Sequence, residues 1–259
     1  MQDITLVQGI MLSIMAMVIG FDFWIEALFI FRPIIVCTLT GLILGDLQLG
    51  LIAGGLTELA FAGLTPVGGT QPPNPVLAGV MTTVIAYTTN VEPVVAIGLA
   101  LPFSFLMQYI ILFYYSTFSV FMAKADKLAK NADMSGFAKL NLLTIFIVGL
   151  TYGVVVFLCT YIAQEPMKLL VENFPPALVH GLGIAGGILP AVGFGLLLKV
   201  MLKGNMIPFL IAGFLYATYN TFANLLPVAL LGAALAIFVY TNDKQKVAVS
   251  TGGHVNEGI

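Results

Sequence analysis

Glu58 and the amides that follow it could bind a polar, uncharged ligand. Glu58 lies in a long stretch without other charges, and its two oxygens could accept hydrogen bonds from vicinal hydroxyls. Gln71 and Asn74 add both donors and acceptors. No arginine–lysine pair lies nearby in the sequence to hold a phosphate or carboxylate. These residue types favour a sugar as the ligand.

Further candidates lie upstream of Glu58. Asp22 and Glu26 are four residues apart and share a helical face, where they either line the same cavity or face water at a boundary. Trp24, the only tryptophan, either stacks on a sugar ring or anchors the chain at a membrane interface. We therefore expect the substrate site to be formed by Glu58, Thr57, Gln71, Asn74, Asp22 and Trp24.

The composition requires a membrane environment for these residues. Of 259 residues, 59% are apolar and only 8% are charged, whereas soluble domains carry about 25% charged residues. A soluble enzyme is thereby excluded. The net charge of −2 offers no basic surface for nucleic acid. The chain is predicted to be an integral membrane protein.

Long uncharged runs indicate several membrane-spanning helices, since one span takes about 20 apolar residues. The run 204–242 is too long for one helix, and Asn220, Asn224 and Pro227 predict a helical hairpin there. Runs 93–123 and 140–164 predict single spans. The predicted fold is an all-α, multi-span helical bundle. The uncharged runs are 4–21, 59–91, 93–123, 140–164, 173–198 and 204–242.

The N-terminal half departs from regular spans. Small residues four apart, Gly41 with Gly45 and Gly50 with Gly54, predict closely packed helices. Glycines and prolines in residues 63–75 prevent a regular helix. Such backbone survives at membrane depth only inside the protein or beside a water-filled cavity, and transporters build substrate sites in this way. We expect broken or re-entrant helices and an irregular site region at about 22–92; an interfacial loop is the alternative.

The lysines set the predicted orientation. All lysines except Lys168 gather at residues 124–139, at 199–203 and at 244–246, and these three groups lie on one side if the spans are as above. By the positive-inside rule that side is the cytoplasm, and residues 164–178 are extracytoplasmic. Residues 1–241 are then the membrane-embedded domain, and residues 242–259 form a polar cytoplasmic tail.

Patterns for catalysis are missing from the sequence. There is no P-loop, kinase or Ser/His/Asp motif, so we assign no catalytic residue. Cys37 and Cys159 lie in apolar runs without a CxxC motif or a Cys/His cluster, which argues against a metal site or a disulfide framework. No cofactor is expected.

Several segments resemble one family of sugar transporters. Residues 31–46 (FRPIIVCTLTGLILGD) and 54–58 (GGLTE) closely resemble the IIC subunit of mannose-type (mannose/fructose/sorbose) sugar phosphotransferase systems. The similarity continues through 185–193 (AGGILPAVG) and 208–214 (PFLIAGF), and it covers the chain up to about residue 241. Thr57-Glu58 and 70–75 (TQPPNP) are closest to the N-acetylgalactosamine/galactosamine branch, since mannose-type proteins carry an acidic residue at the position of Asn74.

This resemblance implies a transport function. A IIC subunit binds its sugar and passes it across the bacterial inner membrane within a phosphoenolpyruvate-dependent system. It has no phosphorylation chemistry of its own, because IIB phosphorylates the sugar on the cytoplasmic side, with IIA and HPr upstream. The resemblance also implies a IID membrane subunit as partner and a trimer of IIC–IID pairs. The implied substrate is N-acetylgalactosamine or galactosamine.

Two other functions remain open from the residues. The chain could be a stand-alone proton-coupled sugar transporter, with Glu58 or Asp22 as the titrating group. It could also be a structural membrane subunit or bacteriocin receptor without a ligand site. Dependence of uptake on soluble phosphocarriers distinguishes the first from a phosphotransferase subunit, and sugar binding by the purified complex excludes the second.

Overall fold

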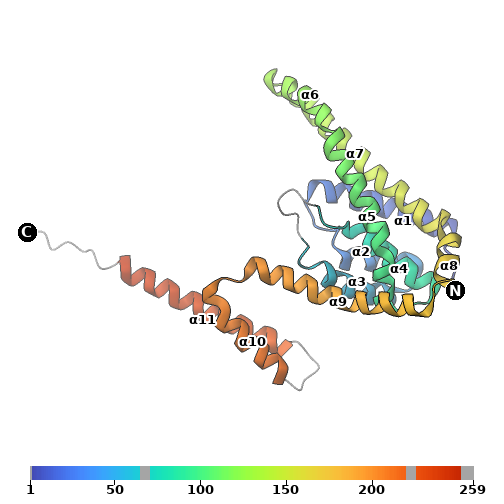
Figure 1. The fold of residues 1–259 in the computed structure, drawn as a ribbon. Helices are drawn as coiled ribbons and strands as arrows, with labels where there is room; N and C mark the ends of the chain where they lie inside the picture. Colours follow the sequence, from blue (N-terminus) through green and yellow to red (C-terminus); the bar gives the residue numbers. More distant parts are fainter. Residues whose placement is uncertain (1, 65–70, 220–225, 252–259) are drawn as a thin grey trace, which may run out of the picture. The chain divides into compact units, whose positions relative to one another are not determined.

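The computed structural model describes residues 2–64, 71–219 and 226–251, and every regular element in these ranges is helical (Figure 1). The chain divides into two compact units, Met1–Val200 and Met201–Ile259. In chain order the elements are α1 (Leu6–Ile25), α2 (Pro33–Leu44), α3 (Leu47–Phe61), α4 (Pro75–Thr89), α5 (Pro93–Thr117), α6 (Ser119–Lys130), α7 (Met134–Phe157), the π-helix η1 (Leu158–Ile162), α8 (Gln164–Glu172), α9 (Pro176–Met201), the 3-10 helix η2 (Gly204–Met206), α10 (Ile207–Tyr219) and α11 (Leu226–Thr251).

Within the described residues, four helices are long and apolar enough to cross a membrane: α1, α5, α7 with η1, and α9. Two of them, α5 and α7, occupy most of the runs predicted to be single spans. Their outer faces carry large apolar side chains that remain exposed, as expected for surfaces that face lipid. The prediction of an all-α, multi-span membrane protein is confirmed.

Helices α2, α3 and α4 are too short to span a bilayer. They have 12, 15 and 15 residues, which corresponds to about 18–23 Å at 1.5 Å per residue, against roughly 30 Å of hydrocarbon. Gly41 and Gly50 bring α2 and α3 into backbone contact: a Cβ atom on Gly41 would lie 2.6 Å from Cα of Gly50. The close packing predicted from the glycine spacing is confirmed at these two positions.

Helices α1 and α7 pack antiparallel along their length. The hydroxyl of Ser13 donates a hydrogen bond of 2.8 Å to the carbonyl of Gly153. Gly20 lies against the ring of the fully buried Tyr152, and a Cβ atom there would approach Cδ2 of the ring to 2.6 Å. A Cβ atom on Gly9 would lie 2.9 Å from Cβ of Tyr161, in η1, so the start of α1 lies beside the end of α7.

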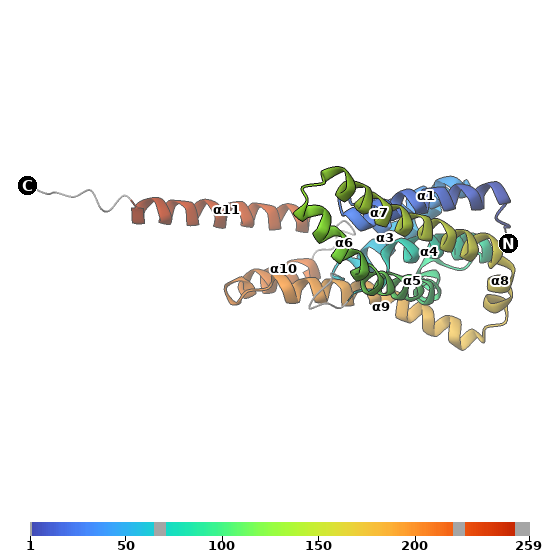
Figure 2. The same ribbon diagram turned by 90° about the horizontal axis from the view of Figure 1, so that it is seen from above.

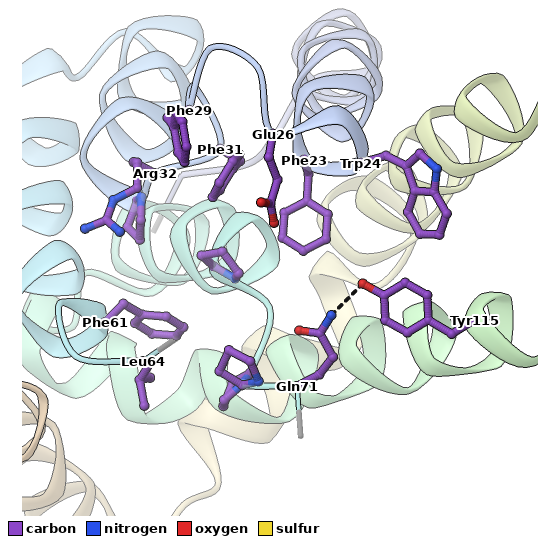
Figure 3. Close-up of a pocket in the computed structure, with 14 residues that line it drawn as sticks. Phe23, Trp24, Glu26, Phe29, Phe31, Arg32, Phe61, Leu64, Gln71 and Tyr115 are labelled. Carbon is purple, nitrogen blue, oxygen red and sulfur yellow. Dashed lines mark hydrogen bonds between the residues drawn. The ribbon is translucent and has the colours of Figure 1, made fainter. Parts of the chain in front are cut away.

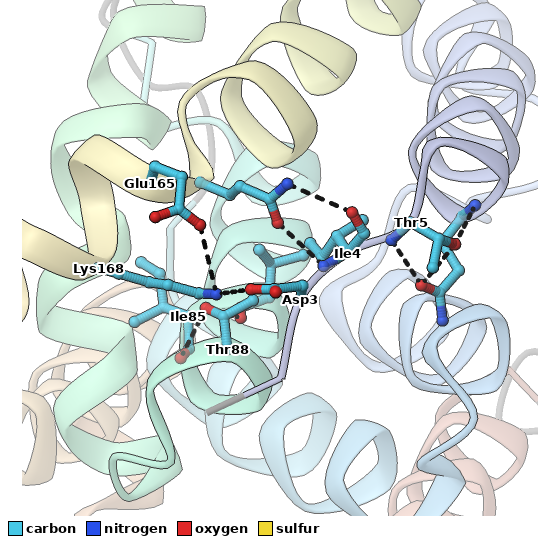
Figure 4. A network of polar contacts seen from close by, with 10 residues as sticks. Asp3, Ile4, Thr5, Ile85, Thr88, Glu165 and Lys168 are labelled. Atoms are coloured by element: carbon cyan, nitrogen blue, oxygen red, sulfur yellow. Dashed lines mark hydrogen bonds and ion pairs between the residues drawn. The ribbon is translucent and has the colours of Figure 1, made fainter.

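Hydrogen bonds and an ion pair join the N-terminal segment to α8 at this end of the first unit (Figure 4). The backbone of Ile4 exchanges two hydrogen bonds with the Gln164 side chain: its N–H donates to Oε1 at 2.9 Å, and its carbonyl accepts from Nε2 at 3.3 Å. Lys168, which is 7% exposed, pairs with Asp3. Helix α6 lies at the opposite end of α7 (Figures 1 and 2).

The predicted orientation fits this arrangement. Lysines 124, 127 and 130 of α6 and Lys139 of α7 lie at one end of the first unit, and α8 with the N-terminal segment lies at the other. If the lysine-rich end is cytoplasmic, the N-terminus is extracytoplasmic. The assignment of sides itself remains a prediction.

Single-cysteine labelling is expected to report opposite sides for the two ends. We expect cysteines at Ser135 and Ser250 to be protected from an impermeant thiol reagent in intact cells. A cysteine at Glu165, whose side chain is 70% exposed, should be labelled. The background would lack the buried Cys37 and Cys159. Labelling at Ser135 without labelling at Glu165 would reverse the orientation.

The second unit contains η2, α10 and α11. The two helices flank the predicted hairpin turn, whose residues Asn220 and Asn224 lie outside the described residues, while Pro227 is in the first turn of α11. Helix α11 continues to Thr251, past the boundary that we predict at 241/242 between the membrane domain and the polar tail. That division remains a prediction.

Candidate functional site

A cavity of about 390 Å³ lies in the first unit where several helices end (Figure 3). Its walls come from the end of α1, the connection to α2, the end of α3, residues 71–75 before and at the start of α4, and the last turns of α5. The volume is within the range of small-molecule sites, about 300–1,000 Å³. The lining is mostly aromatic, with a few polar groups: Phe23, Trp24, Glu26, Phe29, Phe31, Arg32, Pro33, Phe61, Leu64, Gln71, Pro72, Pro73, Pro75 and Tyr115.

The short helices place their ends at this cavity. Pro33 is the first residue of α2 and Pro75 is the first residue of α4, so both helix N-termini border it. Residues 71–74 are not helical, as predicted for this part of 63–75; residues 65–70 lie outside the described residues. Helix N-termini carry partial positive charge. The site therefore combines broken helices with polar side chains, as many transporter sites do.

Glu26, Gln71 and Tyr115 provide polar atoms at the cavity. Nε2 of Gln71 donates to the hydroxyl of Tyr115 at 2.6 Å. The Glu26 carboxylate approaches from the opposite wall, toward the side where Gln71 lies (Figure 3). Trp24 stacks on Tyr115, with ring centroids 5.5 Å apart, and meets Phe118 edge-on at 5.6 Å. Of the expected site residues, Trp24 and Gln71 thus line one cavity.

Glu58 lies beside the cavity and is held by Arg32. Its Oε1 accepts from Nε of Arg32 at 2.7 Å and also from Nη2, and its Oε2 accepts from the N–H of Ile34 at 3.2 Å. Arg32 lines the cavity, whereas Glu58 does not. The sequence reasoning missed this partner because Arg32 is 26 residues away. The one feature of the sequence that points to this partner is that Arg32 is the only arginine in the chain.

Asp22 faces neither the cavity nor water. It is 5% exposed, and its two oxygens accept from the N–H groups of Leu28 (2.6 Å) and Ile30 (2.7 Å). The carboxylate therefore shapes the connection between α1 and α2, which carries part of the cavity wall. Glu26, on the other hand, does line the cavity.

Asn74 and Thr57 are buried and do not line the cavity. Asn74, 2% exposed, accepts from the N–H of Leu77 at 3.1 Å and donates to the hydroxyl of Tyr152 at 2.5 Å. Its carbonyl accepts from the Ser104 hydroxyl at 2.8 Å. The buried Thr57 hydroxyl has no partner among the described residues. In this structure Asn74 links α4 to α5 and α7 through these bonds. Sugar binding by Asp22, Thr57, Glu58 and Asn74 remains a prediction.

The Arg32–Glu58 pair can be tested by a double-mutant cycle. Because the two side chains are 41% and 23% exposed, we expect a coupling of about 1 kcal/mol or less, as for other accessible pairs. Arg32→Gln and Glu58→Gln should each lower the melting temperature in detergent, and the double variant should lose less than the sum. Strictly additive losses would show that the pair does not stabilise the protein.

No cluster of three or more His, Cys, Asp or Glu side chains that could hold a metal ion occurs among the described residues. The polar atoms at the cavity are instead suited to hydrogen bonds with an organic ligand. The lining therefore provides aromatic contacts and hydrogen bonds for a polar molecule.

The amino-acid sequence is similar to sugar permease subunits. The family model described as "PTS system sorbose-specific IIC component" matches residues 6–238. The N-acetylgalactosamine permease IIC component 1 of Escherichia coli K12 is 63% identical over 95% of this chain and 92% of that relative. The mannose-specific EIIC component of the same organism is 26% identical over 91% and 88%. The sorbose-specific EIIC component of Klebsiella pneumoniae is 28% identical over 95% and 93%.

Two solved structures share the fold. One, described only as a membrane protein, has a TM-score of 0.84 and 25% identity over 92% of this chain and 97% of the other. The second is a chain of the mannose transporter ManYZ in complex with microcin E492, with a TM-score of 0.59 and 25% identity over 93% and 97%. Both comparisons agree with a multi-span membrane protein.

Proposed function

The chain belongs to the IIC family of sugar-specific membrane subunits of the phosphotransferase system, and from this we propose that its cavity binds an amino sugar, N-acetylgalactosamine or galactosamine, for phosphorylation by IIB. The observation that carries the proposal is the lining of the cavity. Aromatic rings suit the apolar face of a pyranose, and Glu26, Gln71 and Tyr115 offer the hydrogen bonds that its hydroxyls need. The choice of sugar follows the 63% identical relative.

The position of the cavity suits delivery toward the cytoplasm. Trp24 in its wall packs against Phe118, which joins α5 to the lysine-bearing α6. On the predicted orientation, the bound sugar therefore lies near the cytoplasmic end. A phosphoryl group moves there from the phosphohistidine of IIB to a sugar hydroxyl. The added negative charge is repelled by Glu26, so the phosphorylation favours release into the cytoplasm.

We propose the remaining subunits from the family. They are a IID membrane subunit, IIB as the transient phosphoryl donor, IIA and HPr upstream, and a trimer of IIC–IID pairs. As a component of a phosphotransferase system, the chain works with other components of that system. The likeness to a chain of the ManYZ complex supports a membrane partner.

The proton-coupled alternative has less support. Its titrating group would be Glu58 or Asp22, yet Glu58 is bound by Arg32 and a backbone N–H, and Asp22 is bound by two backbone N–H groups. Protonation of either carboxylate would weaken these bonds, because a neutral carboxyl group is a weaker acceptor. A purely structural role, in turn, does not account for a cavity lined by aromatic and polar side chains.

Binding by the purified complex tests the proposal. The full chain, purified with the membrane subunit that accompanies it, would be titrated with N-acetylgalactosamine, galactosamine, their gluco epimers, mannose and sorbose. We expect the galacto amino sugars to bind most tightly. In cells, uptake should stop when the soluble phosphocarriers are removed. Uptake that continues without them, or a complex that binds none of these sugars, would refute the proposal.

A further inference from the structure

We propose that Glu26, rather than Glu58, is the carboxylate that binds the hydroxyls of the sugar, and that the backbone is strained to hold it in the cavity. The inference rests on the proposed function, since it assumes that the cavity of Figure 3 holds a sugar. The sequence leaves open whether Glu26 lines the cavity or faces water, and Glu26 is not among the six residues expected to form the substrate site. Three observations support a role in sugar binding: the backbone conformation of Glu26, the lack of a partner for its side chain among the described residues, and its surroundings.

The backbone of Glu26 adopts a conformation that a glutamate rarely takes. Glu26 ends α1 with φ 52° and ψ 41°, in the left-handed region, and its N–H donates to the carbonyl of Asp22 at 2.6 Å. Helices that end in this way usually place glycine or asparagine there, because a side chain with a Cβ atom is disfavoured. Phe29, another residue of the cavity wall, is also left-handed, at φ 57°. Strain of this kind is common at ligand sites.

The Glu26 carboxylate is available for a ligand. Among the described residues, Glu26 takes part in no ion pair, and its side chain accepts no hydrogen bond. Arg32, the cation in the cavity wall, is already bound by Glu58 through two of its nitrogens. The two carboxylates therefore have different roles. Glu58 holds Arg32, and Glu26 presents unoccupied acceptors.

The surroundings of Glu26 match a sugar. Phe23 and Phe31 flank its carboxylate, and Gln71 lies across the cavity (Figure 3). A carboxylate can accept from two adjacent hydroxyls at once, and bonds to a charged acceptor are stronger than those to a neutral one. Aromatic rings beside it suit the apolar face of the same ring. We therefore assign two neighbouring hydroxyls of the sugar to Glu26.

Two substitutions separate binding from stability. Glu26→Gln keeps the shape but removes the charge, and we expect at least a tenfold weaker affinity for N-acetylgalactosamine. Glu26→Gly removes the side chain and relieves the left-handed strain. This variant should melt at a higher temperature than the unmodified complex and still bind at least tenfold more weakly. If Glu26 had only a structural role, its replacement would lower the melting temperature and the sugar affinity together.

Glu92→Gln is the matched control. Glu92 is an exposed glutamate directly before α5, and it does not line this cavity. The control should bind like the unmodified complex in the same titrations. Wild-type affinity in both Glu26 variants would overturn the inference and leave the proposed function intact. Loss of galactosamine binding with unchanged N-acetylgalactosamine binding would also overturn it, because Glu26 would then bind the ammonium. If the unmodified complex binds no amino sugar, the inference on Glu26 and the proposed function both fail.

Discussion

Replacing Asp22 with alanine is expected to lower the free energy of unfolding by about 3–6 kcal/mol and to abolish sugar binding. The buried carboxylate accepts two short backbone hydrogen bonds, from Leu28 and Ile30. Bonds to charged groups contribute about 1.5–3 kcal/mol each. Without them, two N–H groups in a partly buried connection lose their acceptor. This connection carries Glu26 and Arg32, so the cavity should lose one wall.

Thermal unfolding in detergent and sugar titration would measure the two effects of Asp22→Ala. Asp22→Asn keeps one acceptor oxygen and should give an intermediate loss. Asp133→Ala is the control, because Asp133 also accepts from a backbone N–H, that of Gly136 at 2.9 Å, at the start of α7 and away from the cavity. It should cost about 0.5–2 kcal/mol as a lost helix cap and leave binding intact. An Asp22→Ala complex that melts and binds like the unmodified one would contradict this account.

Gly50→Ala should destabilise the protein by about 3 kcal/mol or more, at the upper end of the usual cost of overpacking. A Cβ atom on Gly50 would lie 2.7 Å from the carbonyl oxygen of Cys37 and 2.9 Å from Cα of Gly41. These are backbone atoms of α2, which cannot turn away as a side chain could. Helices α2 and α3 would have to move apart. Arg32, at the start of α2, would then move away from Glu58, near the end of α3.

Gly55 provides the comparison within the same helix. A Cβ atom there meets no atom within 4 Å. Gly55→Ala should therefore be neutral or stabilising by up to about 1 kcal/mol, from the better helix propensity of alanine. The melting temperatures and the yields of folded protein would be measured for both variants. Equal behaviour of the two would show that α2 and α3 do not touch at Gly50.

The sequence predicts the architecture better than the site. Uncharged runs and lysine clusters follow from the cost of placing charge in lipid, and this cost acts on each segment by itself. The pairing of Arg32 with Glu58 depends on how α2 and α3 align after their turn, which no local pattern specifies. Likewise, Asp22 and Glu26 lie four residues apart on one predicted helical face, so the sequence pattern does not distinguish their roles. Their opposite roles follow from the left-handed turn at Glu26, where the chain leaves the helix.

The pairing of α1 with α7 also has a consequence for biosynthesis. Ser13 bonds to Gly153, 140 residues later in the chain. At roughly 5–20 residues per second, the ribosome needs on the order of ten seconds to make that stretch. During this time α1 has no α7 to pack against, although the backbone donors to Asp22, at Leu28 and Ile30, follow within eight residues. Helices α2 and α4 also contact α1 and are made before α7, so we expect them to be its first packing partners.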